Sequence, residues 1–187
     1  MLGVAEGLFS RNGIRATGVD LVAAEAGVAP TTLYRLFSSK DGLVGAYVER
    51  ADQEFRAMYT EVIAAAGPEP RDQVLALFDF VYAQISSERF RGCALLRTLA
   101  EFRDPELPGH RNAMAAKAWI RQSIGDLTDR LGVEHPAELA DHLTLVLEGL
   151  YASGQSLGRV GPAKRARRLA EVILANAEPR SDGAEVG

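Results

Sequence analysis

The sequence predicts an all-α fold of nine helices. Apolar residues recur at the 3.6-residue spacing of a helix along most of the 187-residue chain, and glycine or proline residues separate one periodic segment from the next. We identify no strand pattern and no internal repeat of solenoid length. The expected helices cover residues 2–12, 18–26, 30–36, 40–66, 70–87, 91–103, 110–131, 136–158 and 162–177.

The first three predicted helices are short. The second has the i, i+3, i+4, i+7 apolar spacing of a buried face, and Thr17 with Asp20 forms a capping-box pattern before it. Gly27 ends this helix at a position that usually needs positive φ, and Pro30 fits the first turn of the third helix. The third helix turns Leu33 inward but is too short to bury much, so we expect its exposed face to carry its function.

The six remaining helices are separated by clear breaks. Residues 38–39, both serine, cap the start of the fourth helix, and the Gly-Pro-Glu-Pro segment 67–70 ends it. The break at 105–109 separates the sixth helix from the seventh, while Gly132 and the segment 158–162 end the seventh and eighth. The apolar stripes of the fifth and seventh helices are Val74, Phe78, Val81 and Ile85, and Ile120, Ile124, Leu127 and Leu131.

Composition is that of an ordinary globular protein of the cytoplasm. Apolar runs are too short for a membrane span, the N-terminus lacks the pattern of a secretory signal, and the single Cys93 excludes an intramolecular disulfide framework. The net charge of −4 does not exclude a nucleic-acid partner, because local charge decides phosphate affinity. Residues 1–50 nevertheless carry as many acidic groups as basic ones, so strong nonspecific electrostatic binding is not expected.

The N-terminal pattern resembles a known family. The residues that carry the resemblance are Ala23, Ala26-Gly27-Val28, Thr32-Leu33-Tyr34, Phe37, Ser39-Lys40 and Leu43. Together they resemble the helix-turn-helix of the tetracycline-repressor (TetR) family. Two features depart from the family: Ala29 at the N-cap of the third helix has no side-chain acceptor, and the chain begins almost inside the first helix, without preceding basic residues. The resemblance implies a helix-turn-helix DNA-binding domain over 1–50 and a ligand-binding and dimerisation domain over 51–178. The polar, glycine-containing composition of the last residues predicts a disordered tail over 179–187.

DNA contacts are expected from the helix-turn-helix. A short helix can present side chains to base edges in the major groove, and Tyr34 resembles the family tyrosine that hydrogen-bonds a phosphate. Lys40 is a cation in the first turn of the fourth helix, where the positive end of the helix dipole disfavours it. A DNA phosphate at this position would remove the conflict, because it binds both the lysine and the free N–H groups of the helix. The alternative is that Lys40 extends into water. The predicted DNA-binding residues are Thr17, Thr31, Thr32, Tyr34, Arg35 and Lys40.

The resemblance also implies a pocket for a small apolar or amphipathic effector in the second domain. The helices there carry more aromatic groups than a thin bundle needs, although a filled core is the alternative for each one. For Arg97 the alternative is a solvated ion pair with Glu101, four residues on. The predicted ligand-binding residues are Phe55, Met58, Tyr59, Phe78, Tyr82, Arg97, Trp119, Ser123, Glu148 and Tyr151.

The eighth and ninth predicted helices are expected to form a homodimer interface. Rows of small and apolar residues permit close helix approach to a symmetry mate, although packing within one chain is the alternative. The predicted interface residues are Leu143, Leu147, Leu150, Gly154, Ala166, Ala170 and Ile173. The basic run 164–168 is interpreted as a solubilising face rather than a second nucleic-acid site.

The sequence therefore predicts a regulator and not an enzyme. It shows no phosphate-binding glycine loop, nucleophile motif or metal-ligand spacing, so we expect no cofactor and no metal. The expected function is ligand-released repression: the protein binds a palindromic double-stranded DNA operator as a homodimer, and the effector releases it. The alternative is a helical ligand-binding or protein-interaction bundle that has lost operator binding.

Overall fold

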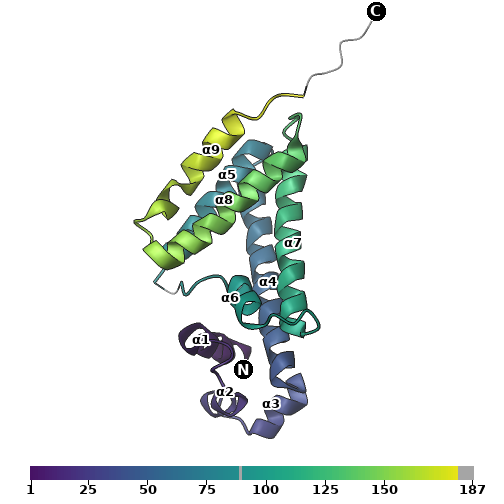
Figure 1. Cartoon of the computed structure of the whole chain (residues 1–187), viewed down its shortest axis with the longest axis vertical. Helices are drawn as coiled ribbons and strands as arrows, with labels where there is room; N and C mark the ends of the chain where they lie inside the picture. The colour runs from purple at the N-terminus through teal and green to yellow at the C-terminus, as the bar shows by residue number, and fades with distance from the viewer. Residues whose placement is uncertain (89, 181–187) are drawn as a thin grey trace, which may run out of the picture. The chain divides into compact units, whose positions relative to one another are not determined.

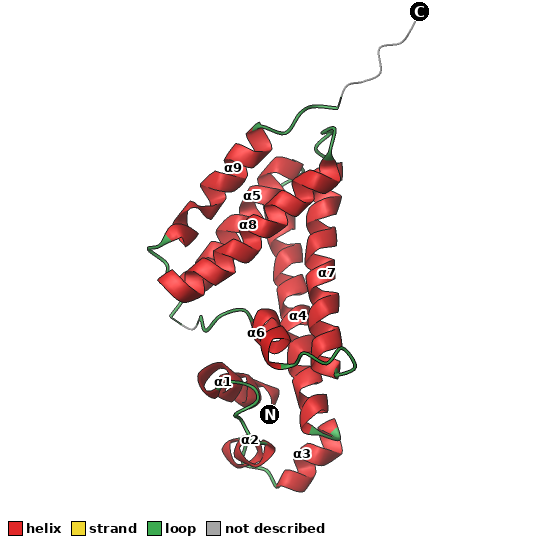
Figure 2. Ribbon diagram, in the orientation of Figure 1, coloured by secondary structure: helices red, strands yellow, loops and turns green. Residues whose placement is uncertain are grey.

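The computed structural model describes residues 1–88 and 90–180, and within them it is all-α, with no strand (Figures 1 and 2). The elements are α1 (Leu2–Asn12), α2 (Val19–Glu25), α3 (Pro30–Phe37), α4 (Lys40–Ala65), α5 (Pro70–Ser86), α6 (Ala94–Glu101), α7 (Pro108–Asp129), α8 (Pro136–Leu157), the 3-10 helix η1 (Pro162–Arg165) and α9 (Ala166–Ala175). The predicted fold is confirmed. The main differences are a shorter α6 and a 3-10 turn at the start of the ninth helical segment.

The chain forms two compact units. Unit 1 consists of Met1–Ala57 and Arg91–Ala118, and unit 2 consists of Met58–Phe90 and the chain from Trp119 onward. Helices α4 and α7 contribute residues to both units, whereas α6 belongs to unit 1. The units therefore divide the chain differently from the boundary predicted at residue 50, because α6 and the start of α7 pack with the N-terminal helices.

Unit 1 has an apolar core around α1 and α4. The rings of Phe9 and Tyr47 meet edge to face with centroids 5.2 Å apart, and both residues are buried. Burial raises the pKa of the Tyr47 hydroxyl to about 12. Leu33 on α3 and Val22 on α2 are fully buried, so both helices of the predicted helix-turn-helix are packed on one face.

The turns before and after α3 fix its position. Gly27 has a φ of 66°, as predicted, and Pro30 is the first residue of α3. After α3, Ser38 takes a φ of 62°, and the Gly42 N–H donates to Ser39 Oγ at 3.0 Å, which confirms the predicted serine cap. A Cβ at Gly42 would lie 2.0 Å from the Phe37 carbonyl oxygen, so only glycine allows α4 to start this close to the end of α3.

Helix α7 begins in close contact with α4. A Cβ at Gly45 would lie 2.7 Å from Pro108 Cβ, and a Cβ at Gly109 would lie 2.7 Å from Val44 Cγ1. Asn112 Nδ2 donates to the Gly45 carbonyl oxygen at 3.0 Å. Small residues on both helices thus allow the backbone of α4 to pack directly against the first turn of α7.

In unit 2, helices α5, α8 and α9 lie side by side (Figure 1). Gly154 of α8 packs so tightly against Ile85 of α5 that a Cβ there would lie 2.7 Å from Ile85 Cδ1. The Arg180 N–H donates to the Gly132 carbonyl oxygen at 2.8 Å, and Val133 pairs with Pro179 in an isolated bridge. The first two residues of the predicted disordered tail are therefore ordered; 181–187 lie outside the described residues.

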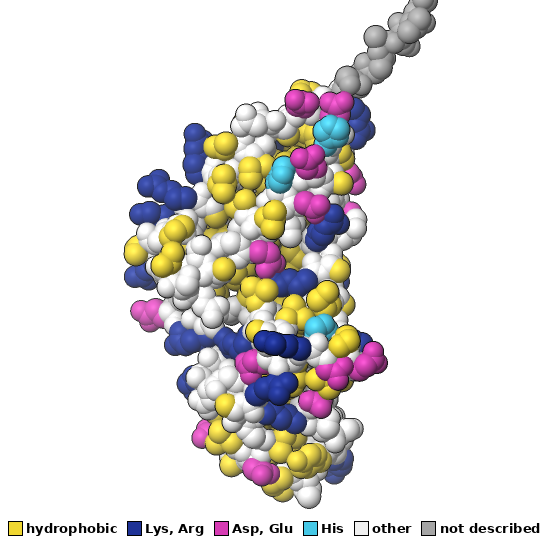
Figure 3. Space-filling view, in the orientation of Figure 1, with side chains coloured by type: hydrophobic (Ala, Val, Ile, Leu, Met, Phe, Trp, Pro, Cys, Tyr) yellow, Lys and Arg dark blue, Asp and Glu magenta, His cyan; other side chains and the backbone are white. Residues whose placement is uncertain are grey.

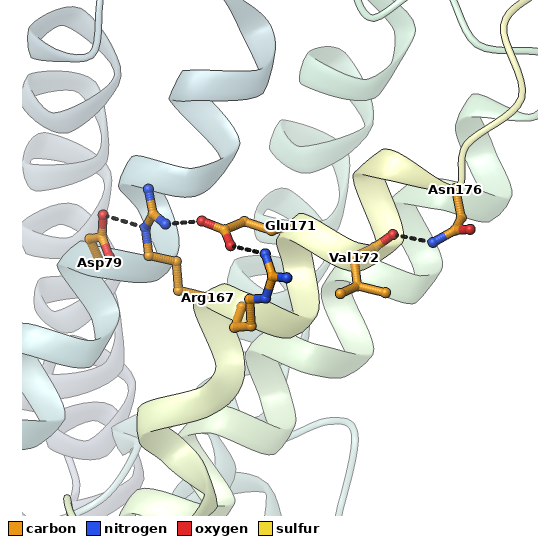
Figure 4. A network of polar contacts seen from close by, with 6 residues as sticks. Asp79, Arg167, Glu171, Val172 and Asn176 are labelled. Carbon is orange, nitrogen blue, oxygen red and sulfur yellow. Dashed lines mark hydrogen bonds and ion pairs between the residues drawn. The ribbon is translucent and has the colours of Figure 1, made fainter.

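Polar contacts attach α9 to α5. Arg167 Nε donates to Asp79 Oδ2 at 2.9 Å, and Glu171 binds the guanidinium groups of both Arg167 and Arg168 (Figure 4). These hydrogen bonds lower the pKa of Glu171 and raise that of Arg167. Part of the basic run 164–168 is thus paired with acidic groups of the same chain.

The close approach at Gly42 predicts a specific destabilisation. Gly42→Ala should lower the free energy of unfolding by about 1–3 kcal/mol, because the added methyl group meets backbone that must shift. Gly7→Ala on α1 is the matched control, where the new Cβ meets only the flexible end of Arg11, and it should stabilise the helix by about 0.5–1 kcal/mol. Urea unfolding at one protein concentration measures both; equal stability of the two variants would contradict the packing described at the α3–α4 junction.

Candidate nucleic-acid interface and its connections

Helix α3 exposes most of the residues predicted to bind DNA. Thr31 and Arg35 are exposed, Tyr34 is 46% exposed, and Thr32 is half-buried beside them. The N-cap of α3 is Ala29, whose side chain makes no cap hydrogen bond, as its chemistry dictates. The N-terminal end of α3 therefore presents hydroxyl, phenol and guanidinium groups to solvent on one short helix.

Thr17 does not belong to this exposed surface. Its side chain is 1% exposed, and its hydroxyl donates to the Gly13 carbonyl oxygen at 2.7 Å. The N-cap of α2 is Gly18 and not Thr17, so the predicted capping box is wrong. Because the hydroxyl is buried and already bonded, we revise Thr17 from a phosphate contact to a residue that orders the α1–α2 loop.

Lys40 lies at the first position of α4 and contacts the same loop. Its Nζ donates to the Arg15 carbonyl oxygen at 2.6 Å, and burial lowers the pKa of its ammonium group. The contact gives the ammonium group a partner within the chain, at the first turn of α4. The ammonium group has further N–H donors, so its predicted contact with a phosphate stays a proposal.

The attachment of α6 to the N-terminal helices was not foreseen from the sequence. The Glu101 carboxylate accepts the backbone N–H of Ile14 at 3.2 Å and that of Arg15 at 2.7 Å. Arg15 Nε donates to the Glu101 carbonyl oxygen at 2.5 Å, and its guanidinium group lies over the Phe102 ring at 5.3 Å. Glu101 thus closes the α1–α2 loop from outside the first 50 residues.

Arg97 adds a second connection one turn earlier on α6. Its Nη1 donates to the Phe9 carbonyl oxygen near the end of α1 at 3.3 Å, and its Nη2 donates to the Arg91 carbonyl oxygen. The expected alternatives for Arg97 were a ligand contact and an ion pair with Glu101; instead, both side chains bind backbone of unit 1. The only sequence signal was the pair of opposite charges four residues apart.

The remaining predicted ligand-binding residues fall into small groups. Phe55 belongs to unit 1, like Arg97, whereas the others belong to unit 2. Phe78 is 1% exposed and fills the core, so we no longer expect it to contact a ligand. The rings of Tyr59 and Trp119 meet edge to face at 5.2 Å, and the Tyr59 hydroxyl donates to the Ser123 carbonyl oxygen at 3.2 Å.

Gln84 connects two further predicted ligand residues and was not identified from the sequence. Its Nε2 contacts Met58 Sδ at 3.7 Å, and its Oε1 accepts a hydrogen bond from the Tyr151 hydroxyl at 3.3 Å. The Phe90 ring lies 6.4 Å from that of Tyr151. The Tyr82 hydroxyl instead donates to the Arg159 carbonyl oxygen, away from this group. Glu148 is half-buried in the same unit.

Most of the predicted dimer residues are buried within one chain. Leu143, Leu147, Leu150, Gly154, Ala166 and Ala170 are all buried, and Ile173 is half-buried. A side chain covered by its own chain has little surface to offer a partner, although Leu150 and Ala166 still line one of the surface hollows described below. Periodicity identified the apolar face of α8 correctly, but α5 already covers part of it.

A different set of apolar residues is exposed on α8 and α9. Leu145 is 69% exposed, Leu169 49% and Val172 43%. Two hollows of about 440 and 400 Å³ lie along these helices, one lined by Val172 and Ile173 with His142, the other by Leu145 and Leu169 with Val146. Hydrophobic side chains are visible on the surface over both helices (Figure 3). Neither hollow is lined by a predicted ligand residue.

The described residues include neither a membrane-spanning helix nor a metal-binding cluster. No helix in that part of the chain is both long and apolar enough to cross a membrane. The same residues contain no cluster of three or more histidine, cysteine or acidic side chains that could hold a metal ion.

Comparison with known proteins identifies the family. The sequence model described as "Bacterial regulatory proteins, tetR family" matches residues 2–47. The HTH-type transcriptional regulator BetI of Stenotrophomonas maltophilia is 30% identical over 156 residues, which cover 81% of this chain and 78% of BetI. This chain is a member of the TetR family. The regulator is also 25% identical to HTH-type transcriptional regulator YjdC of Escherichia coli, over 98% of this chain and 96% of YjdC.

A solved structure agrees with the assignment. The TetR-family regulator SCO4454 of Streptomyces coelicolor superposes with a TM-score of 0.89 and 33% identity, over 94% of this chain and 93% of that one. The family prediction is therefore confirmed, and this TetR-family protein is a DNA-binding transcriptional regulator. The model match covers α1 to α3 and the start of α4.

The exposed face of α3 predicts two kinds of variant. Tyr34→Phe should weaken binding to all DNA sequences alike, by about 1 kcal/mol, because it removes one hydrogen bond to a phosphate. Thr32→Ala and Arg35→Ala should change which bases are preferred, at a cost of about 1–3 kcal/mol at the contacted base pair. Selection of bound sequences from a random duplex pool tests each variant. If Thr32→Ala and Arg35→Ala select the parental motif, the assignment of α3 to the major groove is wrong.

Proposed function

We propose that this regulator is a homodimeric repressor that a small apolar or amphipathic effector releases from a palindromic operator. The observation that carries the proposal is the attachment of α6 to the DNA-reading helices. Arg97 and Glu101 lie outside the segment that matches the family's DNA-binding model, yet they hold the end of α1 and the α1–α2 loop by side-chain hydrogen bonds. A displacement of α6 would therefore disturb the end of α1 and the loop that leads into α2.

The mechanism is a population shift between two conformations. An effector releases DNA only if it binds the DNA-incompetent conformation more tightly than the competent one. By the same linkage, operator DNA must weaken effector binding by an equal factor. Competition of the operator against unrelated duplexes in a gel shift distinguishes this function from that of a bundle that has lost operator binding.

The exposed apolar residues of α8 and α9 support a dimer. A palindromic operator presents two half-sites, and helix-turn-helix proteins read these as symmetric dimers. Leu145, Leu169 and Val172 expose large apolar side chains beside two hollows, and a second copy is the occupant that would cover them. The proposed interface keeps the predicted helices but moves to these residues.

The interface predicts that a charge at Leu145 separates the subunits. In the proposed dimer Leu145→Glu buries a carboxylate without a partner, which disfavours association strongly. Met114→Glu is the matched control, because Met114 is also an exposed apolar residue, 53% exposed on α7, but lies outside the interface. Analytical ultracentrifugation should show a monomer for Leu145→Glu and a dimer for Met114→Glu. A dimeric Leu145→Glu protein would exclude this face.

Half-buried aromatic and thioether groups of unit 2 support an effector site. Met58, Tyr59, Trp119 and Tyr151 are all half-buried, so each keeps apolar surface that a ligand could cover. Gln84 supplies an amide between Met58 and Tyr151, which suits the polar end of an amphipathic molecule. Burial raises the pKa of the Tyr59 hydroxyl, and this hydroxyl is held in place by its hydrogen bond to the Ser123 carbonyl oxygen.

Trp119 gives a direct readout of effector binding, because it is the single tryptophan of the chain. A lipophilic compound that raises the melting temperature should also change Trp119 fluorescence and release operator DNA at the same concentrations. Tyr151→Phe should weaken this binding by about 1 kcal/mol and leave ligand-free DNA affinity unchanged. Tyr34→Phe, the same substitution on α3, should weaken DNA binding and leave effector binding unchanged. Compounds that release DNA without any fluorescence response would place the effector elsewhere.

A further inference from the structure

The recognition helix exposes one large apolar side chain. Leu36 of α3 is 59% exposed, more than Tyr34 on the same helix at 46%. Its neighbours Thr31 and Arg35 are exposed as well, whereas Leu33 is fully buried. More than half of this leucine side chain is open to solvent, so it is available to a partner of the helix.

Helical geometry places Leu36 in a definite row. Successive residues turn by about 100° around a helix, so residues four apart lie nearly one behind the other. Thr31 and Arg35 form a polar row on the side opposite Leu33. Thr32 and Leu36 form a second row beside it, which carries a threonine methyl group and a leucine side chain. Helix α3 thus presents one polar row and one apolar row.

The major groove offers a matching apolar group. Its floor consists of hydrogen-bond donors and acceptors, together with the C5-methyl group of thymine. We propose that Leu36, supported by Thr32, selects thymine at one position of each operator half-site by contact with this methyl group. The proposal rests on the DNA-binding function and adds an apolar specificity determinant to the polar contacts of Arg35.

The expected size of the effect follows from the area of one methyl group. Burial of one such group contributes enough free energy to change affinity about fourfold. Two subunits read a palindromic operator, so the two fourfold effects multiply. Loss of both methyl groups should therefore weaken binding by more than tenfold. Since a tenfold change equals about 1.4 kcal/mol, this loss corresponds to about 1.6 kcal/mol.

Replacement of thymine by uracil tests the contact, because uracil lacks only the methyl group. A duplex is first selected from a random pool by the wild-type protein, and each thymine is then replaced in symmetric pairs by deoxyuridine. One pair should weaken wild-type binding by more than tenfold. Leu36→Ala should bind the thymine duplex correspondingly more weakly and show no further loss with that deoxyuridine pair.

Leu21→Ala is the matched control. Leu21 is 41% exposed on α2, the helix that does not enter the groove, so this variant should keep the full wild-type penalty for deoxyuridine. Circular dichroism and melting temperature should match the wild type for both variants, since both side chains are exposed. Equal binding of the thymine and all deoxyuridine duplexes by the wild type, or an undiminished penalty in Leu36→Ala, would overturn the proposal. Failure of the pool to yield any preferred sequence would instead overturn operator recognition itself.

Discussion

The arrangement of the DNA-reading helices depends on one carboxylate. Glu101, the last residue of α6, accepts the backbone N–H groups of Ile14 and Arg15 in the loop that joins α1 to α2. Ile14 is fully buried, so without Glu101 its N–H would lack a partner where water cannot easily replace it. Arg15 returns the contact through the Glu101 carbonyl oxygen and the Phe102 ring. Because Lys40 binds the Arg15 carbonyl oxygen, the same loop also fixes the start of α4, which follows the recognition helix.

This arrangement makes α6 part of the DNA-binding unit, although the family's sequence model ends at residue 47. Helix α6 has only eight residues and two buried side chains, those of Leu95 and Thr98, so apolar packing alone holds it weakly. Its position instead depends on directed hydrogen bonds from Arg97 and Glu101, which have few alternative geometries. A small displacement of α6 would break these bonds rather than stretch them, which suits a switch between two states. In the proposed repressor this is the step at which effector binding would reach α3.

The local structure could be predicted because its signals are local. Gly27 and Gly132 have positive φ at the ends of helices, and Pro30, Pro70 and Pro136 begin them. The long-range part could not be predicted, because nothing near Glu101 in the sequence indicates a partner 86 residues away.

Periodicity shows which face of a helix is apolar but not what covers it: Leu150 is buried in its own chain, while Leu145 is exposed. The predicted phosphate contact of Thr17 could not be judged from the sequence for the same reason, because its hydroxyl is buried and donates to the Gly13 carbonyl oxygen. The residues of α3 that are proposed to bind DNA lie in one short element, where residue chemistry and helix geometry suffice to predict which of them are exposed.

Amide hydrogen exchange at Ile14 and Arg15 tests the central role of Glu101 most directly. In the wild type both amides should exchange slowly, because each donates to the carboxylate. In Glu101→Gln, which removes the charge and one acceptor oxygen, the buried Ile14 amide should exchange about tenfold to a hundredfold faster, corresponding to the roughly 1–3 kcal/mol that a lost buried partner costs, and the exposed Arg15 amide should exchange faster by a smaller factor. Glu106→Gln, the same change at an exposed carboxylate of unit 1, should leave them unchanged. Equal exchange in the wild type and Glu101→Gln would show that the loop is held by other contacts, and the account of α6 as the support of the DNA-reading helices would be wrong.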